Sequence, residues 1–135
     1  MIKYNELKVG DLVLAEYDGN LKEGEVVGLN GDEKQVCVQI EEMQEFWFQP
    51  DQLSPLMLDE AQLFRMGFQK HANDDGSIKY MHGAFRVLLA KPNNFGEFDI
   101  WYREDRRHIV HPIKLHEFQN HYYDMTKVHL TKAEA

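Results

Sequence analysis

The first 55 residues consist of short stretches that favour β-strands, separated by stretches that favour tight turns. Asp11–Tyr17 alternates apolar and polar residues, and the sequences DGN at 18–20 and NGDEK at 30–34 are typical of hairpin turns. Strands are expected at Asp11–Tyr17, Glu23–Leu29, Gln35–Ile40 and Glu45–Leu53. Short strands at this spacing, with no helix between them, predict a small closed barrel, since closure removes exposed sheet edges.

The next segment has the start and stop signals of a short helix. Asp59 suits the N-cap position, Gln62 completes a capping box, and Gly67 can take the left-handed conformation that ends a helix. We therefore expect a linking helix at about residues 59–66. Two helical turns are not stable alone in water, so tertiary packing must hold this helix in place.

The remaining residues predict a small antiparallel sheet that is closed by a C-terminal helix. Strands are expected at IKYMH, AFRVLLA and FDIWYR, with EDRR as a turn and HIVH as the start of a last strand. The apolar stripe of a helix at about residues 115–126 is formed by Leu115, Phe118, Tyr122 and Met125. The expected fold is α+β, with a barrel at residues 1–55 and a sheet with two helices at residues 56–135.

Two segments resemble a family of small uncharacterised bacterial and phage-encoded proteins. LHEFQNHYYDMTKVHL (Leu115–Leu130) resembles a "VHELQNLYFALTGKEL" ending, and SPLMLDEAQLFRMGF resembles a "PIPLTEEWLLKLGF" segment that precedes a sheet. The chain departs from this ending where ALTG becomes DMTK, which loses a glycine. The resemblance implies an SH3-like barrel in the first half of the chain, and it implies no particular activity.

Charge and composition limit the location and the partners of the protein. Residues 1–55 hold four lysines and twelve acidic residues, a net charge of −8, whereas residues 56–135 hold eleven of each sign. An acidic half repels phosphate groups, which disfavours nucleic acid as a partner without excluding it. Cys37 is the single cysteine, and we find neither a signal sequence nor an apolar run long enough to span a bilayer. These features predict a cytoplasmic protein that is not inserted in a membrane.

Four of the seven histidines lie in the stretch HIVHPIKLHEFQNHYYD, which raises the question of a metal site. On a strand, His108 and His111 point to opposite faces. On a helix, His116 and His121 are about 140° apart around the axis. Neither pair can therefore chelate a metal locally, and we expect no metal and no other cofactor. Histidines that are distant in sequence could still be brought together by the fold.

His116 is the most informative of these histidines. The resemblance places it at the histidine of the "VHELQN" segment, in the first turn of the last helix. A helix N-terminus disfavours protonated histidine, so a neutral structural role is favoured. The alternative is a binding surface that is built from His116, Gln119 and Asn120.

Trp47 is a candidate binding residue in the first half. Phe46, Trp47 and Phe48 are consecutive on an expected strand, so alternation turns Trp47 away from its two neighbours. Trp47 either packs against the second half of the chain, which we favour, or points outward and docks a peptide.

Arg103, Arg106 and Arg107 form the one basic cluster of the sequence. Acidic residues lie between them, so internal pairing or a solvated turn is favoured over contact with a phosphate or an RNA.

No arrangement that is typical of catalysis is present in the sequence. Cys37 has no adjacent histidine, neither serine lies in a nucleophile elbow, and there is no phosphate-binding loop. We therefore expect a non-enzymatic protein–protein interaction or assembly module, whose partner could be a second copy of the chain. The alternatives are a nucleic-acid-associated accessory protein and, less favoured, a small metal-dependent hydrolase that uses histidines.

Overall fold

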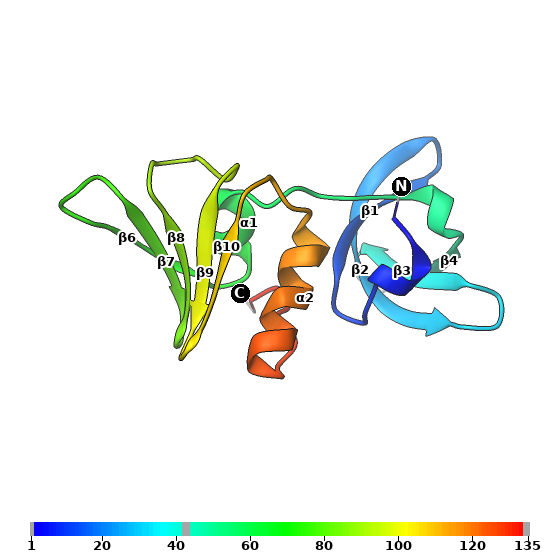
Figure 1. The fold of residues 1–135 in the computed structure, drawn as a ribbon. Helices are drawn as coiled ribbons and strands as arrows, with labels where there is room; N and C mark the ends of the chain where they lie inside the picture. The colour runs from blue at the N-terminus through cyan, green and yellow to red at the C-terminus, as the bar shows by residue number, and fades with distance from the viewer. Residues whose placement is uncertain (1, 42–43, 134–135) are drawn as a thin grey trace. The chain divides into compact units, whose positions relative to one another are not determined.

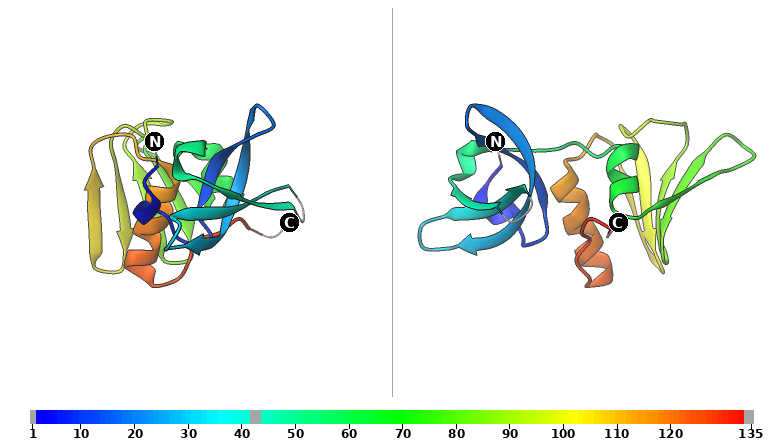
Figure 2. Two further views of the ribbon diagram at one scale, coloured as in Figure 1. Left: turned by 90° about the vertical axis from the view of Figure 1, so that its right-hand side faces the viewer. Right: turned by 180° about the vertical axis from the view of Figure 1, so that it is seen from behind.

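A computed structural model describes residues 2–41 and 44–133. It is an α+β structure in which two five-stranded antiparallel sheets are accompanied by two α-helices in the described residues (Figures 1 and 2). The chain divides into two compact units: Met1–Leu56 with Lys114–Asn120, and Met57–Ile113 with His121–Ala135. The first half of the last helix thus belongs to the same unit as the first sheet. The expected division at residue 55 had assigned the whole of that helix to the second half of the chain.

The first sheet has the strand order β4-β3-β2-β1-β5. Its two predicted turns separate β1 from β2 and β2 from β3, and Asp18 and Lys34 take left-handed conformations there, with φ of 53° and 55°. The strands are β1 (Leu12–Tyr17), β2 (Asn20–Asn30), β3 (Gln35–Glu41), β4 (Gln44–Phe48) and β5 (Leu53–Ser54).

The expected closed barrel is not formed in the described residues. β4 and β5 are the two ends of the strand order, and no ladder joins them. A 3-10 helix at Pro50–Gln52 separates these strands, and Pro50 has no N–H with which to extend the ladder. β5 is two residues long and pairs with Leu14 and Ala15 of β1. The sheet therefore has an open edge along β4, and the SH3-like form of this half stays a prediction.

The core of the first unit lies on one face of this sheet. Val36, Val38 and Ile40 alternate along β3 and are buried, as their spacing predicts. The core cluster on this face includes Ile2, Leu7, Val13, Ala15, Val26, Val36, Val38, Ile40, Phe48 and Leu53.

The second sheet is a meander with the strand order β10-β9-β8-β7-β6. One face is apolar and buried: Tyr80, Phe85, Val87 and Ile100 have no exposed surface. The last hairpin differs from the prediction, because β10 begins at Asp105 and the turn consists of two residues. Arg103 makes that tight turn with a φ of 55°. The strands are β6 (Gln69–Ala72), β7 (Ile78–His82), β8 (Phe85–Leu89), β9 (Phe98–Tyr102) and β10 (Asp105–Ile109).

Helix α1 (Glu60–Arg65) begins and ends where its sequence signals lie. The Asp59 carboxylate accepts a hydrogen bond of 2.9 Å from the backbone N–H of Gln62. Gly67 has a φ of 88°, which lets the backbone N–H of Phe68 donate to the carbonyl of Leu63 over 3.0 Å. Phe68 then packs edge to face with Phe85 of β8, so the chain leaving the helix is fixed to the second sheet.

Helix α2 (Leu115–Thr126) is capped at both ends by its own residues. At the start, the Glu117 carboxylate accepts from the backbone N–H of Lys114 over 3.0 Å. At the end, Lys127 has a φ of 64°, at the position where the resembled ending has glycine. In the second unit, Tyr122 of α2 lies with its ring centroid 4.7 Å from that of Phe85. No helix in the described residues is long and apolar enough to cross a membrane.

Candidate functional site

Strand β4 presents aromatic side chains to solvent. Phe48 is 5% exposed and belongs to the core, whereas Trp47 is 53% exposed. Alternation therefore turns Trp47 to the face opposite Phe48. Phe46 shares the face of Phe48 but lies at the margin of the core, where it is 36% exposed and its ring stacks on Tyr17 with centroids 4.7 Å apart.

Trp47 lies above the backbone of β2. Its Cη2 atom is 3.7 Å from the position that a Cβ would take on Gly28, so the absence of a side chain there leaves room for the indole. Cys37 is the cross-strand partner of Trp47 and is buried, and burial raises the pKa of its thiol. A raised thiol pKa disfavours the reactive thiolate, so Cys37 acts as a packing residue beneath Trp47.

The outer edge of β4 has no strand partner in the part of the chain that the structure describes. An unpaired edge presents backbone N–H and C=O groups that another extended chain can bond. Exposed Glu45 lies on the same strand, beside Phe46 and Trp47. This aromatic edge, formed by Glu45, Phe46 and Trp47, therefore combines backbone hydrogen-bonding groups, aromatic surface and negative charge.

Gln119 and Asn120 attach the first half of α2 to the N-terminal segment of the same unit. The Gln119 amide donates to the carbonyl of Gly10 and accepts from the backbone N–H of Leu12, both over 2.8 Å. The Asn120 amide donates to the carbonyl of Glu6 over 2.7 Å. These side chains satisfy backbone groups at the start of β1 and in the segment before it, which is a structural role.

His116 is fully buried in the same unit. Its Nε2 atom lies 3.0 Å from the carboxylate of Glu6, and its Nδ1 atom has no partner among the described residues. Because a carboxylate only accepts, the Nε2 atom carries a hydrogen and donates it to Glu6. With no exposed surface, His116 cannot form part of a binding surface in this conformation.

The three arginines of the basic cluster do not act together. Arg106 and Arg107 are adjacent on β10, so their side chains point to opposite faces of the second sheet. Arg107 contacts Asp105 and lies 3.0 Å from Nδ1 of His121 on α2. Arg103 lies in the turn, with its guanidinium 5.2 Å from the centre of the Tyr102 ring. Arg107 is thus paired with an acidic neighbour, whereas Arg103 lies against an aromatic ring.

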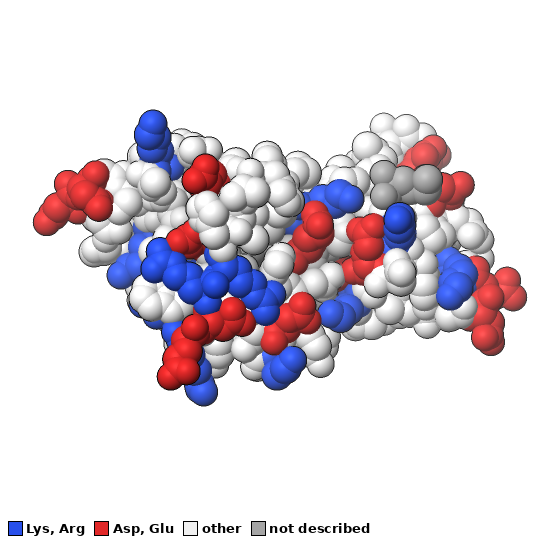
Figure 3. All heavy atoms as spheres, in the orientation of Figure 1, with Lys and Arg blue, Asp and Glu red and all other residues white. Residues whose placement is uncertain are grey.

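Arg106 belongs instead to the face of the second sheet that carries the polar residues. Trp101 of β9 is paired with Arg86 of β8 and with Arg106 of β10. The two guanidinium carbons lie 4.1 Å and 5.0 Å from the centre of the Trp101 ring. Figure 3 shows a band of Lys and Arg side chains over the region where Figure 1 draws this sheet, with acidic side chains along its border.

A pocket of about 540 Å³ opens on this sheet, within the second unit. Its lining includes the apolar residues Ile78, Leu88, Leu89 and Phe98 and the polar residues Lys91, Asn94, Glu97, Asp99, Arg106 and His108. Of the apolar residues, Leu88 shares the polar face of the sheet with Asp99 and His108. A volume of this size is typical of sites for small molecules.

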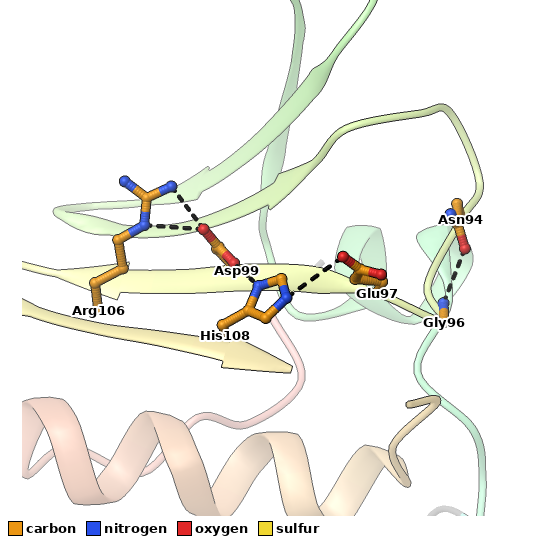
Figure 4. A network of polar contacts seen from close by, with 6 residues as sticks. All are labelled: Asn94, Gly96, Glu97, Asp99, Arg106 and His108. Atoms are coloured by element: carbon orange, nitrogen blue, oxygen red, sulfur yellow. Dashed lines mark hydrogen bonds and ion pairs between the residues drawn. The ribbon is translucent and has the colours of Figure 1, made fainter. Parts of the chain in front are cut away.

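The polar wall of the pocket is organised by Asp99 (Figure 4). One carboxylate oxygen accepts from Nε and Nη2 of Arg106 over 2.9 Å and 2.6 Å, and the other lies 2.5 Å from Nδ1 of His108. Nε2 of His108 faces Glu97 at 3.4 Å. Burial raises the pKa of Asp99, but the bonds from His108 and Arg106 outweigh it, so the pKa lies below its usual value. The bond to Asp99 in turn raises the pKa of His108.

The Asp99–His108 pair is the feature that sequence reasoning missed. The two residues face each other directly in the β9–β10 ladder, and Arg106 sits two positions before His108. The signal was present in the sequence, since a two-residue turn at Arg103 and Glu104 fixes this register. The prediction assigned EDRR to the turn, so it did not place Asp105 and Arg106 on the strand and did not give the register that pairs Asp99 with His108. No group of three or more His, Cys, Asp or Glu side chains in the described residues is placed to hold a metal ion.

Comparisons with family models, with curated proteins and with solved structures found no match to this chain.

Proposed function

We propose that the protein is a non-enzymatic protein-interaction module that binds an extended segment of a partner along β4. The exposure of Trp47 on an unpaired edge strand is the observation that carries this proposal. An extended partner gains affinity by adding a strand to such an edge and gains specificity from side-chain contacts with the aromatic residues. Exposed aromatic residues are also the side chains that contribute most at interfaces.

The charge of the first half indicates what the partner segment contains. The excess of eight negative charges in residues 1–55 attracts a basic segment and repels an acidic one. We therefore propose an extended segment that carries Lys or Arg near an aromatic or aliphatic residue. The five short antiparallel strands support an SH3-like form for this half, and the single cysteine supports a reducing compartment such as the cytoplasm.

Affinities for a set of fixed peptides test the proposal. Fluorescence anisotropy should show binding of basic extended peptides and no binding of acidic peptides of the same length. Trp47→Ala should weaken binding by about tenfold, the usual effect of truncating an aromatic anchor. Phe64→Ala is the matched control, because Phe64 is a 46% exposed aromatic residue on α1, which belongs to the second unit. If the two substitutions weakened peptide binding equally, β4 would not be the binding edge and the proposal would be wrong.

One observation favours a second candidate function, a nucleic-acid-associated accessory protein. The stacked side chains of Arg86, Trp101 and Arg106 resemble the combination of aromatic and cationic groups on which single-stranded bases stack. Binding of single-stranded RNA that weakens with added salt and with Arg86→Gln would support this candidate. Absence of any salt-dependent binding would exclude it.

A further inference from the structure

We propose that the pocket on the second sheet binds a small organic anion, whose carboxylate or phosphate group contacts Arg106, Lys91 and His108. The apolar part of this ligand would lie against Leu88, which shares the face of the sheet that carries Asp99 and His108. This is a site for a small molecule on the second unit, and it is independent of the proposed binding of a protein segment to β4 on the first unit.

The lining of the pocket supplies the two kinds of contact that such a ligand needs. Its volume of about 540 Å³ can enclose a molecule of small-metabolite size. Leu88 and Phe98 lie on neighbouring strands, while Lys91, Asn94 and Glu97 come from the loop between those strands. The charged end of a ligand is thus expected near the loop and β10, and its apolar end against Leu88 on the polar face of the sheet.

Asp99 positions the cationic groups and is not itself free to bind a ligand. Both of its carboxylate oxygens are occupied, one by Arg106 and the other by His108. Its side chain is 19% exposed, whereas those of Arg106 and His108 are 52% and 55% exposed. Figure 4 shows Asp99 between these two residues, which fixes the guanidinium and the imidazole side by side. Groups that are held in place before binding lose less conformational entropy when the ligand arrives.

The donors that remain point to an anion. Nη1 of Arg106 and the amine of Lys91 have no hydrogen-bond or ion-pair partner among the described residues. Arg106 is always charged, so it offers a permanent charge-assisted donor to a carboxylate or a phosphate. Glu97 is the one acceptor with free capacity in the charged part of the lining; it is 65% exposed and faces the histidine at 3.4 Å. A cationic ligand would be repelled by Lys91 and Arg106, and it would find no free buried carboxylate to pair with, since both oxygens of Asp99 are occupied.

Protonation of His108 is expected to strengthen the site. Its ring faces Asp99 on one side and Glu97 on the other, and Arg106 lies on the same face of the same strand. The carboxylates raise the pKa of His108 above its ordinary value of 6.5. Below the raised pKa the ring is an imidazolium that attracts an anion, and as the pH rises through it that attraction is lost. Affinity for the anion should therefore fall with rising pH, and it should not do so in His108→Gln.

NMR titration of the full chain with three simple probes tests the proposal. Benzoate carries a carboxylate, phenyl phosphate carries a phosphate, and benzamide has a similar shape without charge. At least one anion should shift the amide signals of Phe98, Asp99 and His108, and benzamide should bind at least about tenfold more weakly, the loss expected for a charge-assisted hydrogen bond. Which anion binds more tightly distinguishes a carboxylate ligand from a phosphate ligand.

Matched substitutions separate this site from a general attraction to the basic face. Arg106→Gln should weaken binding by about tenfold, whereas Arg86→Gln should change it less than about twofold, since Arg86 also stacks on Trp101 but does not line the pocket. A second pair of variants keeps the test valid if Arg106→Gln disturbs the fold. Lys91→Gln should weaken binding, whereas Lys79→Gln should not, since Lys91 lines the pocket and Lys79 does not. Equal binding of benzamide, equal effects within either pair, or no shift with any probe would overturn the proposal.

Discussion

The imidazole of His116 donates from Nε2 to the carboxylate of Glu6 over 3.0 Å, although 110 positions separate the two residues in the chain. His116 is fully buried, and Glu6 is partly exposed. The bond supplies an acceptor for a ring N–H that water cannot reach. It thereby fixes the first turn of α2 to the segment that precedes β1.

Removing the charge of Glu6 should destabilise the protein at neutral pH. Glu6→Gln weakens a hydrogen bond to a buried donor, so we expect the free energy of unfolding to fall by about 1–2 kcal/mol. The bond from His116 lowers the pKa of Glu6 below 4.5, so its contribution is complete above pH 4.5 and is lost as the pH falls through the lowered pKa. Urea unfolding across this range should show the two proteins converging in acid, while Glu33→Gln, in an exposed turn, stays equal to wild type throughout.

Asp11 has the opposite dependence on pH. Its side chain is 3% exposed, and burial raises its pKa from 3.8 to about 7. Asp11 ionises at the lower value in the unfolded chain and at the higher one in the folded chain, so its contribution to stability should fall as the pH rises from 3.8 to about 7.

Asp11→Asn should remove this penalty. The Asn carbonyl can still accept from the backbone N–H of Lys8, a bond of 2.9 Å in the wild type. We expect the variant to be more stable than wild type by roughly 1–3 kcal/mol above pH 7, because the Asn side chain places no charge in the buried site. Thermal unfolding at acid and alkaline pH measures the difference, and an advantage that is equal at both would contradict the assignment.

Lys127 ends α2 in a conformation that costs energy for any residue with a Cβ. Its φ is 64°, and its backbone N–H donates to the carbonyl of Tyr123 over 2.7 Å. Lys127→Gly should raise the free energy of unfolding by about 1 kcal/mol, because glycine takes this conformation without strain. Lys127→Ala removes the side chain but keeps the strain, so chemical denaturation should find it within a few tenths of a kcal/mol of wild type.

Gly24 lies where β2 passes closely over β3. A Cβ on Gly24 would be 2.5 Å from Cγ1 of Val38 and 2.9 Å from the carbonyl oxygen of Gln39. Because neither the core side chain nor the backbone can move freely, Gly24→Ala should cost about 1–3 kcal/mol of stability. At Gly31 the nearest atom outside the local chain is 3.7 Å away, so Gly31→Ala should change the melting temperature little. Similar losses at both positions would show that the close approach is relieved elsewhere.

The features that sequence reasoning located are those whose cause is local. The Asp59 cap and Gly67 bound α1, and the alternation in β3 identified Val36 and Val38 as core residues. The prediction that the first sheet closes into a barrel was wrong. Closure requires β4 to pair with β5, and the short Pro50–Gln52 helix separates these two strands.

The partners of the candidate site residues depend on contacts between distant parts of the chain. Nothing in the residues near Gln119 indicates that its amide bonds to Gly10 and Leu12, more than 100 positions away. The separation of Arg106 from Arg107, by contrast, follows from strand parity once the turn is placed correctly at Arg103. The sequence could therefore have predicted the facing pair of Asp99 and His108, but not the burial of His116.

Hydrogen exchange along β4 during binding tests the central proposal most directly. A basic extended peptide that adds a strand to this edge would accept hydrogen bonds from the outward-facing backbone N–H groups of β4. We expect amide exchange within Gln44–Phe48 to slow when the peptide is bound, with no change in β5, the other end of the strand order. Peptide binding that leaves exchange in β4 unchanged, or that protects β5 instead, would contradict the proposal that β4 and Trp47 form the binding edge.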